Sequence, residues 1–367
     1  MPYPRFNRID VKMKPLAERT SKAHIEATAV LPNSPQRDLP AHVTATIETC
    51  ADKIVSARQR GRSVILAFGA HTIKNGLGPI ISQLISNNSI THLATNGAGA
   101  IHDWEFSYLG MSGEDVATYA AKGEFGNWEE TGRYINLAIN LGAYRGLGYG
   151  EAVGAMIAEE RLDIPDTNEL TAGATCLTNP EQAAAASLLL GLINKGIITP
   201  GVITLEHKWQ SMSLFCSAFR RNVPFTCHPM IGHDIIYNHP VNSGGLLGIA
   251  AERDFESFAH SVSTLEGGVF LSIGSAVMAP MIFEKCLSIS RNVALQSGKD
   301  IRDFHLQVVD LAASPWDWSQ GEPPQDNAAY YLRYNKTFSR MGADSFNYLQ
   351  ADNRDFLCGL LRVLQSR

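Results

Sequence analysis

The segment CHPMIGHDIIYNHP (227–240) concentrates side chains that could do chemistry. It includes three imidazoles and one carboxylate, those of His228, His233, Asp234 and His239. An imidazole beside a carboxylate suits general acid–base catalysis near neutral pH, and the same groups are ligands for zinc or another divalent metal. The spacing does not match H-E-x-x-H or a comparable zinc motif. Three interpretations stay open: acid–base or hydrogen-bonding roles, metal binding, and a purely structural role.

Two glycine turns earlier in the chain could hold a ligand. Gly69 follows the apolar run 64–68 and opens a polar loop, and the turn NGAG (96–99) follows the apolar run 90–94. Glycine lets backbone N–H groups approach a ligand closely, and a helix N-terminus that follows favours an anion. We therefore expect a nucleotide or a similar polar small molecule at these turns. The residues expected to contact it are Asn75, Asn96, Gly97, Ala98, Gly99 and Asp103.

A third turn, Gly274-Ser275, follows the apolar run 269–273 and precedes a helical pattern. It is again suited to an anion, so Gly274 and Ser275 join the expected ligand contacts. The turns do not form G-x-G-x-x-G, and no acidic residue ends the run 90–94, so the usual dinucleotide fingerprint is absent. The alternative interpretation is that these small residues only make tight turns or permit close packing of a helix on a sheet.

The elements that must position these residues alternate between strands and helices. The apolar run 64–68, the amphipathic segment 77–85 and the apolar run 90–94 form a βαβ unit. Further strands are expected at 201–205, 224–227, 269–273 and 304–311, and further helices at 44–60, 113–122, 128–141, 148–160, 180–194, 211–221, 255–263, 280–290 and 354–364. The segment 165–178 is expected to be a turn-rich connection. This alternation predicts an α/β fold, a Rossmann-like parallel sheet with helices on both faces, whose βα loops share one edge.

Composition limits the class of protein. The chain has 367 residues, 45% of them hydrophobic and 18% charged, which is enough apolar material for a large core. The net charge of −5 argues against nucleic acid or an anionic membrane as the main partner. We find no apolar run of roughly 18 residues, as a membrane span requires, and no signal peptide at the start. Six cysteines without a C-x-x-C pair indicate reduced thiols and a cytoplasmic protein.

Three ranges are expected along the chain. Residues 1–43, rich in proline, form an extended N-terminal arm. Residues 44–311 form the α/β nucleotide-binding domain, and residues 312–367 form a C-terminal tail and helix packed on that domain.

The sequence over 44–311 resembles the deoxyhypusine synthase family. That family's first βαβ unit ends in T-T-A-G-G-x-E-E-D, to which TNGAGAIHD (95–103) corresponds, and a Y-L-G follows as in 108–110. The family's G-D-M-I-F-F-H resembles HDIIYNH (233–239), which places His239 on the family's active-site histidine. Its later glycine turn resembles LSIGSAV (271–277).

The resemblance implies a parallel sheet of nucleotide-binding topology, NAD as cofactor and a homotetramer with active sites between paired subunits. Two positions depart from the family. Its paired glutamates are Ile101 and His102 here, and its imine-forming lysine is Met278. A thioether cannot form an imine, so we expect a reaction other than deoxyhypusine synthesis.

We therefore expect an NAD-binding enzyme of the transferase or oxidoreductase type that acts on a small polar substrate, in a homo-oligomer of two or four chains. His239 is expected to be the acid–base, His233 and Asp234 to support it, and His102 to alter the substrate's charge preference. One alternative is a non-enzymatic nucleotide- or ligand-binding protein. Another is a metal-dependent hydrolase or isomerase that uses His228, Asp234 and His239.

Overall fold

The chain divides into two compact units, each built from segments that lie far apart in the sequence. The computed structural model describes residues 3–35, 37–176 and 178–367. Within them, unit 1 comprises residues up to 27 together with 100–219 and 229–254, and unit 2 comprises 28–99, 220–228 and 255–367. The predicted arm (1–43) and the predicted connection (165–178) each include residues outside this description.

Unit 2 is organised around a six-stranded sheet in which every neighbouring pair is parallel. The strands are β2 (Val64–Phe68), β3 (His92–Thr95), β7 (Phe225–Cys227), β8 (Val269–Ile273), β9 (His305–Asp310) and β10 (Ser345–Gln350). Their order across the sheet is β10-β9-β8-β2-β3-β7. Numbered along the chain, this is the 3-2-1-4-5-6 order of the Rossmann fold. The first three strands extend the sheet to one side and the last three to the other, so the strand order reverses between the first strand, β2, and the fourth, β8. The predicted α/β class is thus confirmed.

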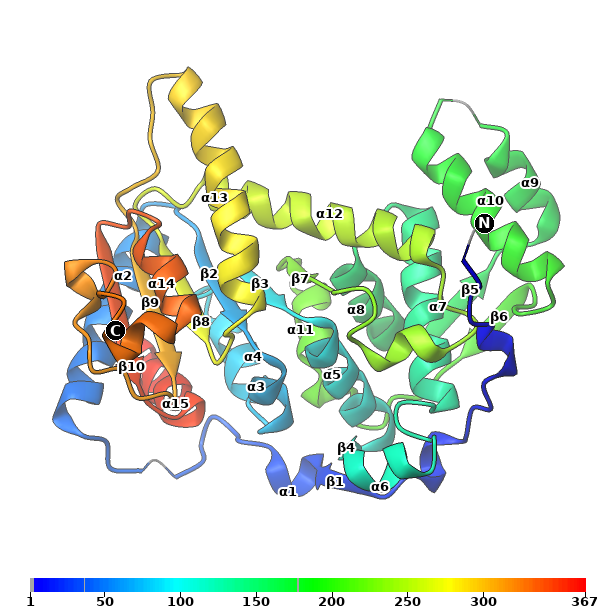
Figure 1. The fold of residues 1–367 in the computed structure, drawn as a ribbon, viewed down its shortest axis with the longest axis horizontal. Coiled ribbons are helices and arrows are strands. Elements are labelled where there is room, and N and C mark those ends of the chain that lie inside the picture. The colour runs from blue at the N-terminus through cyan, green and yellow to red at the C-terminus, as the bar shows by residue number, and fades with distance from the viewer. Residues whose placement is uncertain (1–2, 36, 177) are drawn as a thin grey trace. The chain divides into compact units, whose positions relative to one another are not determined.

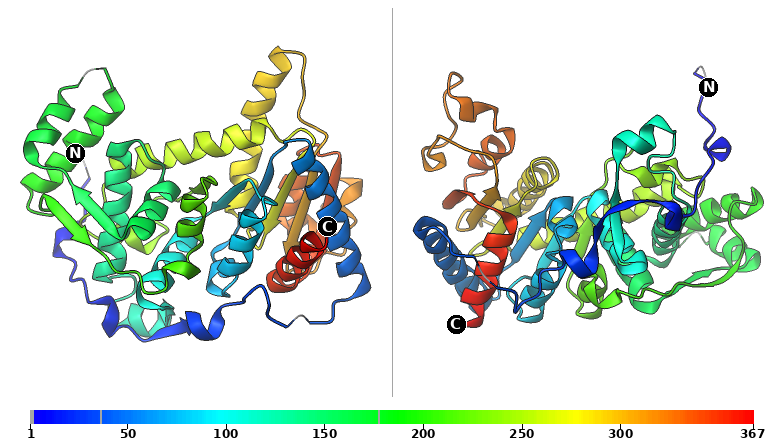
Figure 2. Two further views of the ribbon diagram at one scale, coloured as in Figure 1. Left: turned by 180° about the vertical axis from the view of Figure 1, so that it is seen from behind. Right: turned by 90° about the horizontal axis from the view of Figure 1, so that it is seen from below.

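Helices cover both faces of this sheet (Figure 1). One face carries α2 (Ala41–Gln59), α4 (Gly78–Ser86) and α15 (Asn353–Gln365), and Figure 2 shows α2 and α15 side by side. The other carries α13 (Met278–Gln296), α14 (Arg333–Ser339) and the last turns of α12 (Gly244–Ser263). Every residue of β2, β3, β7 and β8 is buried. Burial on both faces explains why these strands appear in the sequence as continuous apolar runs rather than as alternating patterns.

Aromatic packing fixes the face that carries α13 and α14. Phe270 of β8 stacks on Phe283 of α13, with ring centroids 4.1 Å apart. The ring of Phe338 in α14 lies 6.0 Å from that of Phe270, centroid to centroid. Met278 is 8% exposed and belongs to this apolar core. The residue at the family's lysine position therefore contributes to the core of unit 2.

Unit 1 is mainly helical. Two antiparallel pairs of short strands accompany the helices: β1 (Ser21–His24) with β4 (Met111–Glu114), and β5 (Arg161–Ile164) with β6 (Gly201–Thr204). Helices wholly or partly in this unit are α1 (Ile25–Thr28), α5 (Gly97–Leu109), α6 (Val116–Ala121), α7 (Glu129–Arg145), α8 (Tyr149–Glu159), α9 (Thr167–Ala174), α10 (Pro180–Asn194), α11 (Leu214–Arg220) and α12. Unit 1 also has the short 3-10 helices η1 (Arg8–Asp10), η2 (Leu16–Glu18), η3 (Gln210–Met212) and η4 (Ile235–Asn238). The remaining short elements belong to unit 2: the 3-10 helices η5 (Trp318–Gln320) and η6 (Ala328–Tyr331), and the helix α3 (Ala70–Lys74).

Local predictions differ from the structure at several places. The helix predicted at 255–263 is the second half of α12, which begins at Gly244. The strand predicted at 201–205 pairs antiparallel with β5 and is not part of the parallel sheet. The predicted connection 165–178 contains α9, whose first N–H groups are capped by the Asp166 carboxylate. The predicted helix 113–122 begins only at 116, because residues 111–114 pair with β1. In the described ranges, no helix has the length and apolarity needed to cross a membrane.

Candidate functional site

The loops after β2 and β8 meet where the order of the strands in the sheet reverses. Gly69 directly follows β2, and its N–H donates to the Ile273 carbonyl at 3.1 Å. A Cβ atom at Gly69 would lie 2.1 Å from the carbonyl oxygen of Gly274, so no larger residue fits. The two backbones therefore touch at the crevice where open α/β sheets bind ligands.

The turn after β8 is also shaped by glycine. Gly274 has a φ of +55°, a left-handed conformation that glycine adopts without strain, and its N–H donates to the Val309 carbonyl at 2.9 Å. Ser275 is 7% exposed, and its hydroxyl accepts from the Ala279 N–H at 3.1 Å. The Ser275 hydroxyl thus binds an N–H group of the first turn of α13, and the expected ligand contacts Gly274 and Ser275 lie in the short loop between β8 and this helix.

The turn after β3 forms the first turn of α5. The Asn96 carboxamide oxygen accepts from the Gly99 N–H at 3.0 Å, and a Cβ atom at Gly99 would lie 2.3 Å from the Thr95 hydroxyl. Gly97, Ala98 and Gly99 are therefore the helix start that the sequence suggested, held against β3. Asn75 is exposed and lies at the far end of α3, after the loop from Gly69.

Three strand-to-helix turns with glycine thus share the carboxyl edge of unit 2. Backbone N–H groups at such an edge, together with helix N-termini, suit the phosphates of a nucleotide. Seven of the eight residues predicted to hold a cofactor belong to this unit. The eighth, Asp103, belongs to unit 1 with the predicted catalytic residues His102, His233, Asp234 and His239.

The predicted acid–base His239 has both ring nitrogens engaged. Its Nδ1 accepts from the Val241 N–H at 3.1 Å, so Nε2 carries the proton and donates to the Glu129 carboxylate at 3.1 Å. The His239 side chain is 4% exposed, and burial lowers its pKa despite the opposing effect of Glu129. The imidazole is therefore neutral, and it joins the loop after η4 to α7. The two segments pack closely: a Cβ atom added at Gly132 of α7 would lie 2.8 Å from the Cβ atom of His239.

His233 and Asp234 precede η4. His233 is exposed in a turn, with its N–H donating to the Met230 carbonyl at 3.0 Å. The Tyr237 hydroxyl donates to the Asp234 carboxylate at 2.9 Å. Burial raises the pKa of Asp234, which the Tyr237 hydrogen bond and His233 oppose.

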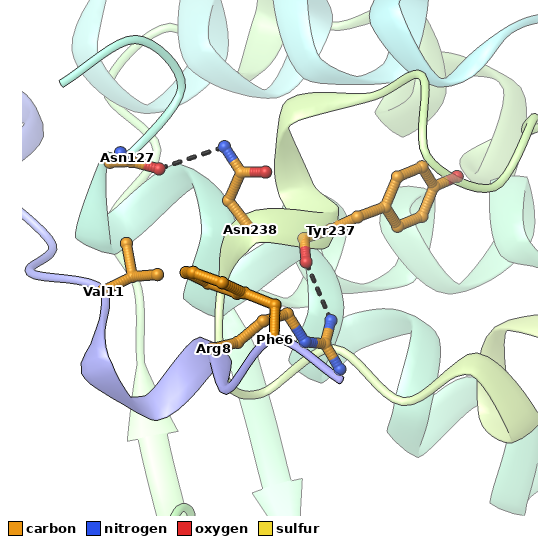
Figure 3. A pocket seen from close by; sticks show the side chains of 6 residues that line it. All are labelled: Phe6, Arg8, Val11, Asn127, Tyr237 and Asn238. Carbon is orange, nitrogen blue, oxygen red and sulfur yellow. Dashed lines mark hydrogen bonds between the residues drawn. The ribbon is translucent and has the colours of Figure 1, made fainter. Parts of the chain in front are cut away.

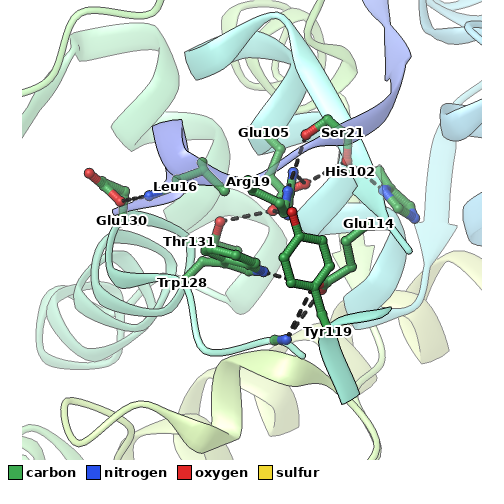
Figure 4. Close-up of polar contacts among 12 residues, drawn as sticks. Leu16, Arg19, Ser21, His102, Glu105, Glu114, Tyr119, Trp128, Glu130 and Thr131 are labelled. Carbon is green, nitrogen blue, oxygen red and sulfur yellow. Dashed lines mark hydrogen bonds and ion pairs between the residues drawn. The ribbon is translucent and has the colours of Figure 1, made fainter. Parts of the chain in front are cut away.

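His102 is held by a buried polar cluster that the sequence did not reveal (Figure 4). The Ser112 hydroxyl donates to the Glu105 carboxylate at 2.6 Å and lies 2.7 Å from His102 Nδ1. Because the hydroxyl proton is directed to Glu105, Nδ1 must be the protonated nitrogen of His102. In the neutral form of His102, Nε2 is then the nitrogen with the lone pair.

Glu105 is the centre of that cluster. The Arg19 guanidinium donates to both of its oxygens at 2.8 Å, and the Thr131 hydroxyl donates at 2.8 Å. Both charged side chains are 1% exposed. Burial opposes ionisation of Glu105, but Arg19 and the hydrogen bond from Ser112 outweigh it and lower its pKa. The cluster ties β1 and its preceding residues to α5 and α7.

Asp103 serves a different purpose from the cofactor contact predicted for it. Its carboxylate accepts from the Ser213 hydroxyl at 2.5 Å and from the N–H groups of Leu214 and Phe215 at 2.8 and 3.3 Å. It thereby caps the start of α11, and it is 2% exposed. Burial, only partly offset by these hydrogen bonds, raises its pKa to about 6.

The raised pKa of Asp103 predicts a specific pH dependence of stability. Its reference pKa is 3.8, so between about pH 4 and pH 6 the folded protein binds more protons than the unfolded chain. The Asp103 contribution to stability therefore falls as the pH rises through this window, by roughly 3 kcal/mol at most. Asp103→Asn keeps the volume and an acceptor for Leu214. We expect the wild-type advantage over this variant in urea unfolding to shrink between about pH 4 and pH 6, and parallel pH profiles would contradict the assignment.

A separate cavity of about 450 Å³ lies beside η1 and η4 in unit 1 (Figure 3). Its lining residues are Phe6, Arg8, Val11, Asn127, Tyr237 and Asn238. The Arg8 guanidinium donates to the carbonyls of Tyr237 and Asn242 at 2.8 and 2.9 Å. Arg8 thus joins η1 to the loop around η4.

The four side chains suggested as metal ligands are divided between the two units. His228 belongs to unit 2, and His233, Asp234 and His239 belong to unit 1. Across residues 3–35, 37–176 and 178–367, no group of three or more His, Cys, Asp or Glu side chains is arranged to hold a metal ion. Nothing in these positions favours the metal-dependent interpretation.

Sequence reasoning missed Arg19, Glu105, Ser112, Thr131 and Glu129. One signal was available: Glu105 stands between the aromatic residues Trp104 and Phe106, and a buried charge requires a partner. No local pattern identifies Arg19 as that partner, because 86 positions separate the two.

No protein-family model and no curated protein sequence matches this chain. Solved structures with a similar fold include the ternary complex of AgrE with ornithine and NAD⁺, with a TM-score of 0.44 and 16% identity over 91% of this chain and 34% of that chain. ArgZ, an arginine dihydrolase from the ornithine–ammonia cycle in cyanobacteria, has a TM-score of 0.42 and 13% identity over 90% and 34%. A conserved LOR/SDH protein from Methanococcus maripaludis S2 has a TM-score of 0.43 and 12% identity over 92% and 74%. The chain spans about a third of the length of the AgrE and ArgZ chains.

Proposed function

We propose that the chain is an NAD-binding enzyme whose cofactor lies on the carboxyl edge of unit 2. The observation that carries this proposal is the all-parallel order β10-β9-β8-β2-β3-β7, with backbone contact between the β2 and β8 loops at the reversal. Dinucleotides bind at that reversal in sheets of this topology.

The phosphates would lie against the backbone of these turns, with the first N–H groups of α5, at Gly97 and Ala98, as the proposed donors. The N–H groups of Gly69, Gly99 and Gly274 already donate within the protein, so these glycines, with Ser275 in the loop before α13, would shape the site rather than bind through their N–H groups. Asn96 and Asn75 supply neutral carboxamides on the same edge. Asp103 is the least suited of the predicted contacts, because three hydrogen bonds already engage its carboxylate within unit 1.

His239 and His102 are the proposed acid–base residues. Nδ1 of His239 accepts from the Val241 N–H, and its Nε2 donates to the Glu129 carboxylate. Nδ1 of His102 lies against the Ser112 hydroxyl. An imidazole that a polar partner orients is a common arrangement for proton transfer.

The finer assignment to the deoxyhypusine synthase family rests on the sequence resemblance. Met278 lies in the apolar core at the family's lysine position, so any transfer of an aminobutyl group would have to proceed without an imine there. We therefore propose a related fold with a different small polar substrate, in a homo-oligomer.

A ligand-binding protein without catalysis is the second candidate. The observations that favour it are the full engagement of His239 and the burial of Met278. It differs from an enzyme in one measurable respect: it would bind NAD and leave ligand and cofactor unchanged over hours.

Calorimetric titration with NAD, followed by spermidine, tests the proposal. Saturable NAD binding without a spermidine response is the expected result, and it would support a retained cofactor site with a changed substrate. A response to both would indicate an aminobutyl transfer that avoids residue 278. Absence of NAD binding would overturn the proposal.

A further inference from the structure

A chain of hydrogen-bonded side chains runs through unit 2 toward the carboxyl edge of the sheet. The Ser261 hydroxyl of α12 lies 2.7 Å from His92 Nδ1, and His92 Nε2 lies 3.0 Å from the Thr226 hydroxyl. Thr226 in turn lies 2.9 Å from His228 Nε2. Neighbouring strands thus supply the middle of the chain, with His92 on β3 and Thr226 on β7.

The surroundings keep both imidazoles neutral. Phe258 packs against both rings edge-on, with centroids 5.4 Å from His92 and 5.3 Å from His228. The pKa of each histidine is lowered to about 3, by burial for His228 and by burial together with the nearby His228 and His260 for His92. Neither ring carries charge near neutral pH, so each has one N–H donor and one acceptor nitrogen.

The single hydroxyl proton of Thr226 couples the two rings. If Thr226 donates to His228 Nε2, then His228 carries its proton on Nδ1. If Thr226 donates to His92, or to the Leu93 carbonyl at the longer distance of 3.5 Å, then His228 donates through Nε2 and its Nδ1 accepts. His228 can therefore present either a donor or an acceptor at Nδ1 without changing charge.

His228 lies beside the end of β3, and β3 is the second strand of the sheet in chain order. His228 follows β7 directly, and its N–H donates to the Thr95 carbonyl at 2.8 Å, at the end of β3. Dinucleotide-binding sheets usually have Asp or Glu near the end of the second strand to bind the ribose hydroxyl. Here β3 is followed by Asn96, and His228 is half-buried beside it, in contrast to the fully buried His92.

We propose that His228, through Nδ1, hydrogen-bonds the 2′-hydroxyl of the adenosine ribose of NAD, and that Thr226, His92 and Ser261 position its ring. This inference rests on the proposed function. A neutral group that can donate or accept matches a hydroxyl, which does both. His228 is then the residue that replaces the missing carboxylate.

The test measures NAD binding by calorimetry to the full chain and to His228→Ala, with NAD lacking the adenosine 2′-hydroxyl as a second ligand. Loss of one neutral hydrogen bond should weaken NAD binding roughly fivefold to tenfold in the variant. The deoxy ligand should bind wild type more weakly by a similar factor but should bind the variant as well as NAD does. His42→Ala, which removes an exposed histidine of α2 in the same unit, should bind both ligands like wild type.

A positioning role for Thr226 is tested by Thr226→Val, which removes the hydroxyl and preserves the shape of the side chain. We expect changed imidazole nitrogen chemical shifts for both His92 and His228, together with weaker NAD binding. His228→Gln should recover part of the affinity lost in His228→Ala, because an amide also donates and accepts.

The outcomes separate the two proposals. If wild type fails to bind NAD, the proposed function is overturned and the ribose contact with it. A different result would be that wild type binds NAD while His228→Ala binds it equally well, or that both proteins bind the deoxy ligand more weakly than NAD by the same factor. Either result overturns only the assignment of His228.

Discussion

Removing one partner of the Arg19–Glu105 pair should destabilise unit 1 by about 3–5 kcal/mol. Each side chain is 1% exposed, and the guanidinium donates to both carboxylate oxygens at 2.8 Å. Arg19→Met leaves a buried carboxylate without its cation, and Glu105→Gln leaves a buried guanidinium without its anion. The measurement is urea unfolding followed by tryptophan fluorescence, for which Trp104 and Trp128 are buried reporters in this unit.

The double variant, Arg19→Met with Glu105→Gln, distinguishes charge from packing. No unpaired charge stays buried in it, and the carboxamide oxygen introduced at position 105 can still accept from Ser112 or Thr131. Its loss of stability should therefore be smaller than the sum of the two single losses, with a coupling of roughly 1–3 kcal/mol. If the losses of stability in the two single variants simply add up to that of the double variant, the ion pair has no energetic role.

A matched control lies on β1, shortly after Arg19. Lys22 pairs with Asp115 at 2.7 Å, but both side chains are about half exposed. Water already solvates these charges, so Lys22→Ala should leave the unfolding curve nearly unchanged. A loss as large as that of Arg19→Met would indicate that residues before α5 are sensitive to any substitution, and would contradict the argument from burial.

The parallel sheet was predictable because its signal is local. The runs 64–68 and 269–273 coincide with β2 and β8 to the residue, since strands buried on both faces consist of consecutive apolar residues. That the three glycine turns share one edge of the sheet could be predicted from the common direction of parallel strands alone. The strand β10 was missed because its first four residues are all half-buried, without alternation, and its sequence SFNYLQ mixes polar and apolar residues.

The polar contacts were less predictable because they join distant positions. His239 was chosen for its residue type and its neighbours, but its state depends on Glu129, 110 positions away. Asp103 matched a family position, yet Ser213, Leu214 and Phe215 determine what its carboxylate does. Sequence pattern indicated which residues are able to do chemistry, and tertiary contacts determine which atoms are already occupied.

Gly69→Ala should abolish NAD binding with a smaller effect on stability. The φ of Gly69 is −84°, which any residue adopts, so the need for glycine here is space alone. The added methyl would lie 2.1 Å from the Gly274 carbonyl oxygen, a backbone atom that cannot rotate away. The loops after β2 and β8 must then separate, which should destabilise unit 2 by about 1–3 kcal/mol and distort the crevice in which the phosphates are proposed to lie.

Calorimetric titration with NAD and urea unfolding of the same samples separate these two effects. Gly191→Ala is the control, since a Cβ atom there meets no atom within 4 Å and the residue lies inside α10. It should bind NAD like wild type and gain about 0.5–1 kcal/mol, because alanine is favoured over glycine in a helix. Folded Gly69→Ala that still binds NAD with wild-type affinity would place the cofactor away from the contact between the β2 and β8 loops. The proposed site would then have lost the geometric feature that distinguishes this crevice from the other turns of the edge.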